Sequence, residues 1–219
     1  MTSVRKYSRL IVRPLLAALG LAAALLTFAT PAAAMTFEMI TGASGCGGKT
    51  CILASGLIDK DSVSQFQAFA KKHQVEPGAV VALNSEGGVL LYGLALGDQI
   101  RKAGFSTTLQ DSASGQPSEC ASACVFTFMG GVERSVGKGA RVGVHQIYSD
   151  TKARDSLSVS DAQYLTSLVA LHIDRMGGRL GILILALRTS SDSIHWFSAS
   201  ELSGLSVTTV ERPTQLASN

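Results

Sequence analysis

Three short segments carry groups whose types and spacing could catalyse a reaction. The first is Asn84–Gly88, which reads Asn-Ser-Glu-Gly-Gly and follows a short apolar run. Gly87 and Gly88 lie at an expected helix entry, where backbone N–H groups are bare and can be approached closely. Such N–H groups can stabilise a developing oxyanion. The alternative is an ordinary turn between a strand and a helix.

The other two segments could supply a nucleophile and a base. Ser122 lies in Cys-Ala-Ser-Ala-Cys, between small residues at the expected start of an apolar helix, where a substrate could reach it. A serine hydroxyl is a weak nucleophile until a base takes its proton. His145 ends the expected strand Val-Gly-Val-His-Gln and could be held rigidly as that base. A helix-capping serine and a structural, half-buried histidine are the alternatives.

Taken in order, the three segments resemble the Clp protease proteolytic-subunit family of serine peptidases, within the crotonase-like fold. The resemblance runs from about residue 52 to 207 and includes Ser-Ala-Ser-Glu-Leu at 198–202. It implies that Ser122 is the nucleophile and His145 the base. It also implies that Gly87 and Ala123 donate N–H groups to an oxyanion hole, beside Gly88. Among families of this fold, exported Clp-protease-like proteins of bacteria are the most similar.

The sequence departs from that family at the third member of the triad. The aspartate that orients the histidine would fall at position 194, where this chain has isoleucine. Asp192 lies two residues away and is the expected substitute. An aspartate in this role orients the imidazole and stabilises its charged form. Without it, the site would be a Ser–His pair.

The surrounding pattern predicts the elements that must position these residues. Ser62 and Gln65 form a capping-box pattern at the start of one expected helix, and Ser158 or Ser160 caps another. Strands alternating with helices indicate an α/β fold, which the resemblance makes a crotonase/Clp-protease-like stack of ββα units with crossover helices. Strands are expected at 36–40, 52–58, 79–83, 105–109 and 141–146, and helices from about 62, 89–103, 158–176 and 180–187.

The N-terminal 34 residues have the layout of a secretory signal peptide. Four basic residues precede an apolar run over residues 15–28, and Ala32-Ala33-Ala34 follows as a cleavage site. A retained membrane anchor is the alternative. We therefore expect a single domain over residues 35–219, beginning at Met35, in the periplasm or outside the cell. That part holds 15 basic and 16 acidic residues, which argues against nucleic-acid binding.

The four cysteines fall into two close pairs, which export would oxidise. Four cysteines allow three disulfide pairings, and zinc ligation is the other alternative. We expect Cys46–Cys51, and with it Cys120–Cys124, whereas crosslinks 46–120 or 51–124 would contradict this pairing. Side chains four apart in a regular helix are too distant for a disulfide. The second bond therefore requires Cys120 to lie outside the helix, in the turn that presents Ser122.

These observations favour an exported, ATP-independent serine hydrolase, in particular a peptidase, with a peptide or unfolded protein as its substrate. No ATPase partner, cofactor or metal is expected, and relatives of the fold suggest a homo-oligomer only by analogy. The alternative is a catalytically inactive Clp-like fold that binds a peptide or protein. An acyl-CoA enzyme of crotonase type would use the same oxyanion hole, but exported chains meet no CoA.

Overall fold

Strands and helices alternate along the chain, so the expected α/β class is confirmed. The computed structural model describes residues 33–41, 45–110, 118–148 and 158–210, all of which fall in one compact unit. The expected signal peptide lies almost entirely outside these ranges. Within them, no helix has the length and hydropathy needed to cross a membrane.

The larger sheet has five strands in the order β1-β2-β3-β4-β6. Its strands are β1 (Thr36–Ile40), β2 (Cys51–Ser55), β3 (Val80–Asn84), β4 (Ser106–Leu109) and β6 (Arg134–Val136). β1 is antiparallel to β2, and the other neighbours are parallel. The first four residues of β3 are all buried, which is why an unbroken apolar run occupies the middle of the sheet.

A second sheet holds three short strands in the order β5-β7-β8. They are β5 (Glu119–Ala121), β7 (Arg141–Val144) and β8 (His195–Trp196). Ser85, just after β3, joins the two sheets through backbone hydrogen bonds. Its N–H donates to Glu119 O at 2.8 Å, and its carbonyl accepts from Ala121 N at 3.1 Å. The end of β3 therefore lies directly beside β5.

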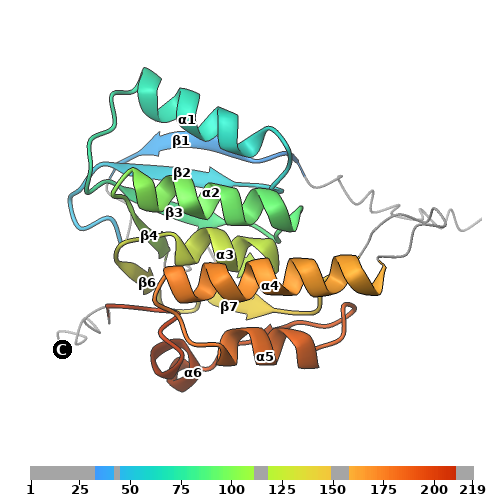
Figure 1. Cartoon of the computed structure of the whole chain (residues 1–219). Coiled ribbons are helices and arrows are strands. Elements are labelled where there is room, and N and C mark those ends of the chain that lie inside the picture. Colours follow the sequence, from blue (N-terminus) through green and yellow to red (C-terminus); the bar gives the residue numbers. More distant parts are fainter. Residues whose placement is uncertain (1–32, 42–44, 111–117, 149–157, 211–219) are drawn as a thin grey trace, which may run out of the picture. The chain divides into compact units, whose positions relative to one another are not determined.

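The helices pack one after another along the sheets, as Figure 1 shows. They are α1 (Ser62–Lys72), α2 (Leu90–Lys102), α3 (Ala123–Met129), α4 (Val159–Arg175), α5 (Gly181–Arg188) and α6 (Ala199–Gly204). α1 packs on β1 and α2, α2 on α3, α3 on α4, and α4 on α5. α3 is buried along its whole length, and it contacts β4 of the larger sheet as well as β5 and β7 of the smaller sheet.

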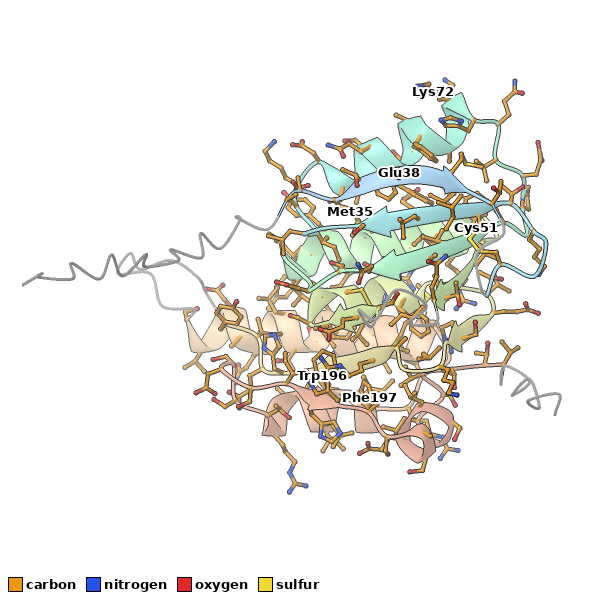
Figure 2. All side chains as sticks on the ribbon, turned by 180° about the vertical axis from the view of Figure 1, so that it is seen from behind. Met35, Glu38, Cys51, Lys72, Trp196 and Phe197 are labelled. Atoms are coloured by element: carbon orange, nitrogen blue, oxygen red, sulfur yellow. A yellow bond between two sulfur atoms is a disulfide. The ribbon has the colours of Figure 1, made fainter. Side chains whose placement is uncertain are left out.

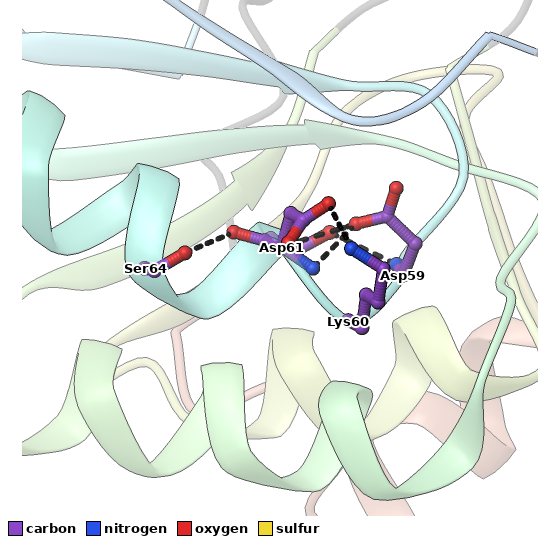
Figure 3. Close-up of polar contacts among 5 residues, drawn as sticks. Asp59, Lys60, Asp61 and Ser64 are labelled. Carbon is purple, nitrogen blue, oxygen red and sulfur yellow. Dashed lines mark hydrogen bonds and ion pairs between the residues drawn. The ribbon is translucent and has the colours of Figure 1, made fainter.

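The start of α1 differs from the expected capping box of Ser62 and Gln65. Asp59 Oδ1 accepts hydrogen bonds from Asp61 N and from the N and Oγ of Ser62, each at 2.9–3.0 Å (Figure 3). The Ser62 hydroxyl is thus directed to Asp59 and does not cap the helix. These hydrogen bonds, that from the Ser62 side chain first, lower the pKa of Asp59. The expected Ser158 cap of α4 is formed, since its Oγ accepts from Asp161 N at 3.0 Å.

Both expected disulfides are formed, Cys46–Cys51 and Cys120–Cys124. The first lies at the start of β2, where Cys51 is opposite Ile40 of β1. Figure 2 shows Cys51 at the end of this sheet remote from Met35. Met35 is buried and donates its N–H to Leu57 O, beyond the other end of β2. The Cys46–Cys51 disulfide therefore closes the short loop over residues 46–51, which leads into β2.

Candidate active site

Ser122 occupies a strained position between β5 and α3. Its backbone has φ 56° and ψ −125°, and it is the residue that precedes the first turn of α3. A non-glycine residue in such a conformation costs about 1–3 kcal/mol and is retained where the surrounding structure imposes it. A serine on a strained strand-to-helix turn is the arrangement that exposes a nucleophile. The half-buried Ser122 hydroxyl has no hydrogen-bond partner among the described residues.

The glycine-rich turn after β3 lies against Ser122. Gly87 has φ 110°, and a Cβ on it would be 2.8 Å from the Ser122 Cβ and 3.2 Å from Ala123 N. The Gly87 N–H, however, donates to the buried hydroxyl of Ser85 at 3.1 Å. Gly87 is therefore not the bare donor that the sequence suggested.

Two other N–H groups are available beside Ser122. Within the described part of the chain, neither the Gly88 N–H nor the Ala123 N–H has an acceptor. Both residues line the same cavity as Ser122. Gly88 and Ala123 are thus the donors that the geometry offers to an oxyanion.

His145 follows the last residue of β7 and is oriented by a backbone carbonyl. Its Nδ1 lies 2.7 Å from Gln146 O. If this contact is the N–H donor of a neutral imidazole, the lone pair is on Nε2, the atom a general base would use. Gln146 is itself held at the end of α5. Its N–H donates to Thr189 O at 2.9 Å, and its Nε2 donates to Leu187 O at 2.7 Å.

Strand pairing brings Ser122 and His145 to the same edge of the second sheet. Ala121 is opposite Gly143 in the parallel β5–β7 pair, and Ser122 N donates to Gly143 O at 2.9 Å. Both side chains line the cavity, but they are not hydrogen-bonded to each other in this structure. Catalytic hydrogen bonds are often long in unliganded enzymes and shorten when substrate binds.

The structure does not bring Asp192 to this site. Asp192 is exposed, does not line the cavity and interacts within its own turn, with Ser190 and Ser193. These hydrogen bonds, that of Ser190 first, lower its pKa. Continued by one residue beyond the His195–Val144 pair, the antiparallel β7–β8 register places Ile194, and not Asp192, opposite His145. The structure therefore gives the expectation for Asp192 no support, because this residue lies in the turn of Ser190 and Ser193, apart from the cavity.

The cavity has a volume of about 610 Å³ and mostly apolar walls. Two acidic residues, Asp59 and Glu86, are among the lining residues, and the described part of the lining includes no lysine. The apolar walls come from four helices that the sequence analysis did not connect with the site. They include Leu90 and Leu91 of α2, Phe126 of α3, Leu165 and Val169 of α4, and Leu183 and Leu187 of α5. Apolar residues four positions apart in the expected helices were the sequence signal that could have indicated these walls.

The second disulfide spans the turn that carries Ser122. Cys120 belongs to β5 and Cys124 to α3, with a Cα–Cα distance of 5.2 Å. Cys120 thus lies outside the helix, as this bond required. In this structure none of the four cysteines carries a free thiol.

Comparison with known proteins supports the fold. No protein-family model and no curated protein matches the sequence. Similar solved structures include two of the "1510-N membrane-bound stomatin-specific protease". One is a serine-to-alanine mutant and the other a lysine-to-alanine mutant in complex with a substrate peptide. Each gives a TM-score of 0.53, at 15% and 16% identity, over 73% of this chain and 77% and 73% of the other chains. The chain therefore has a Clp-protease-like fold.

Proposed function

We propose that this protein is a serine hydrolase that cleaves peptides or unfolded proteins without ATP. The observation that carries the proposal is the strained Ser122, which shares a cavity with His145 and with two N–H groups that have no acceptor among the described residues. Strain of this kind is retained where a function requires it. The peptidase fold of the similar structures supports acyl transfer as the reaction class.

The proposed reaction begins when His145 Nε2 takes the proton of the Ser122 hydroxyl. The Ser122 oxygen attacks the substrate carbonyl carbon, and the negative charge moves to the carbonyl oxygen, where the Gly88 and Ala123 N–H groups stabilise it. The imidazolium is stabilised through Nδ1 by the Gln146 carbonyl. It then protonates the leaving amine, and water, activated in the same way, hydrolyses the acyl-enzyme. A rotation of the two side chains within the cavity precedes the first step.

The apolar walls favour substrates that place an apolar side chain beside Ser122. A cavity of this size can enclose such a side chain and remove its surface from water. One similar structure contains a substrate peptide of that protease. It supports a peptide as the substrate of this protein only through the shared fold.

The test is covalent labelling of the purified protein with a fluorophosphonate probe. We expect Ser122→Ala to abolish labelling, and His145→Gln to slow it by roughly 10²–10⁴-fold, as loss of a general base does. Ser64→Ala, on the exposed face of α1, is the control and should label at the wild-type rate. Labelling that persists in Ser122→Ala, or that is absent from the folded wild-type protein, would exclude the hydrolase.

A second candidate is a non-catalytic peptide-binding module. It is favoured by Ile194, which occupies the place of an orienting carboxylate, and by the missing Ser122–His145 hydrogen bond. Unlabelled protein that nevertheless binds peptides, with an affinity that Ser122→Ala does not change, would support it.

We further propose that the protein is exported and begins at Met35 after cleavage. The signal-peptide layout of residues 1–34 and the two disulfides support this. Intact-mass measurement of the protein from its own host should show the loss of residues 1–34. A full-length mass would favour the retained anchor.

A further inference from the structure

We propose that the Cys120–Cys124 disulfide positions the nucleophile and the oxyanion hole, so that the acylation step depends on it. This inference rests on the proposed function and assigns two positioning residues to that same site. The bond closes a ring that contains Ala121, Ser122 and Ala123. The strained residue is therefore the centre of a short cross-linked loop.

The disulfide holds the two halves of the oxyanion hole together. Cys120 is paired with Ser85, whose hydroxyl accepts the Gly87 N–H and so fixes the turn that presents Gly88. Cys124 lies in the first turn of α3, which presents Ala123. Since one cysteine belongs to each side, the bond fixes the distance between the two N–H donors.

Two backbone hydrogen bonds also hold Ser122. Its N–H donates to Gly143 O at 2.9 Å, and its carbonyl accepts from Val125 N at 3.0 Å. The crosslink adds a covalent tie to these hydrogen bonds, because it joins the residue two before Ser122 to the residue two after it. It therefore opposes relaxation of the strained Ser122 backbone. Both sulfurs belong to fully buried residues, so solvent does not compete for the space.

The other disulfide provides a matched control. Cys46–Cys51 has a sequence separation of 5 and a Cα–Cα distance of 5.8 Å, against 4 and 5.2 Å for Cys120–Cys124. It lies beside Val80, at the start of β3, whereas the turn that contains Gly87 and Gly88 follows the end of that strand. The two bonds are therefore similar crosslinks at opposite ends of one strand, and only the second touches the site.

The experiment compares two double variants of the full chain, Cys120→Ala with Cys124→Ala, and Cys46→Ala with Cys51→Ala. Fluorophosphonate labelling is followed against time and probe concentration, at a temperature where circular dichroism shows each protein folded. We expect the first variant to lose at least about tenfold in the maximal labelling rate, with half-saturating probe concentration changed less than about twofold. The second variant should keep both values.

The split between rate and probe affinity separates positioning from a general loss of structure, which would move both values. If the first variant does not fold, the wild-type protein is titrated with a phosphine reductant while each bond is followed by peptide mapping. Labelling must then fall with cleavage of Cys120–Cys124 and not with cleavage of Cys46–Cys51. Wild-type rates in the first variant, or equal losses in both, would overturn the inference. Absence of labelling in the wild-type protein would overturn the proposed function itself.

Discussion

The imidazole of His145 faces a neutral acceptor where the histidine of a Ser–His–Asp triad faces a carboxylate. A backbone carbonyl fixes which ring nitrogen carries the proton, as an aspartate does. It stabilises the imidazolium less, because a carbonyl oxygen carries no negative charge to attract the positive charge of the ring. We therefore expect wild-type acylation to be slow in comparison with a complete triad.

A carboxylate at position 194 should accelerate acylation. The β7–β8 register, continued by one residue beyond the His195–Val144 pair, places residue 194 opposite His145. We expect Ile194→Asp to raise the fluorophosphonate labelling rate by about tenfold or more, since a mispositioned or missing aspartate costs up to ~10⁴ in a complete triad.

Ile194→Asn is the control, because asparagine has nearly the same shape as aspartate and carries no charge. If the asparagine variant gains as much as the aspartate variant, the orienting role of the charge is wrong. Asp192→Asn should leave labelling unchanged within about twofold, because Asp192 interacts within its own turn.

Three helices meet around the buried imidazole of His172. Its Nε2 lies 2.9 Å from Phe126 O of α3, and its Nδ1 lies 3.4 Å from Asp98 Oδ1 of α2. Burial lowers the pKa of His172, and the neighbouring Arg175 and Arg101 lower it further, against the opposing effects of the Phe126 carbonyl and of Asp98. Phe126 also lines the cavity, so this contact connects helix packing to the site.

This burial predicts a pH-dependent stability. The unfolded chain takes up the His172 proton near the ordinary histidine value of about 6.5, and the folded protein takes it up only at lower pH. The free energy of unfolding should therefore fall as the pH decreases below about 6.5. Urea unfolding of His172→Gln between pH 7 and 5 should show a flatter profile than the wild-type protein. The exposed His73→Gln is the control, and an equal flattening there would contradict the assignment.

The longer elements could be predicted from the sequence because their signals are local. The helix that Ser158 caps and the buried run that became β3 lie close to where the pattern predicted them. The second sheet could not be predicted fully, because β5 and β8 have only three and two residues. Their hydrogen-bond partners come from distant parts of the chain. β5, for example, is held by Ser85.

The site could be predicted as residue types but not as individual roles. The order of the motifs predicted that Ser122 and His145 share a site, and both residues line one cavity. The N–H groups proposed as oxyanion donors depend on which N–H the Ser85 hydroxyl accepts, and that is a matter of rotamer and backbone geometry. The partner of His145 depends equally on the path of the turn around Asp192, which no local pattern specifies.

One buried arginine, Arg134, holds the C-terminal segment at residues 206–207 against the core. Arg134, 2% exposed, donates to the carbonyls of Val207 at 2.8 Å, Ser206 at 2.8 Å and Met176 at 3.1 Å. It also reaches Gly131 O at 3.2 Å. Burial lowers the pKa of Arg134 to about 10.

Removal of this guanidinium would leave several buried carbonyls without a donor. We expect Arg134→Met to lower the free energy of unfolding by roughly 3–5 kcal/mol, at 1–3 kcal/mol for each unsatisfied buried group with partial compensation by water. Chemical denaturation measures the change, with the exposed Arg188→Met as the control. A loss below about 1 kcal/mol would show that the C-terminal segment is held by its apolar contacts alone.

The groups of the site are divided between the two sheets. Gly88 follows β3 of the five-stranded sheet, whereas Ser122 and His145 follow β5 and β7 of the three-stranded sheet. Reactivity toward the probe can therefore arise only after the two sheets have docked, a late event that requires contacts distant in sequence. In a refolding experiment with the disulfides intact, probe reactivity should return after the far-UV circular dichroism signal. The rate at which probe reactivity returns would then report the rate at which the two sheets dock.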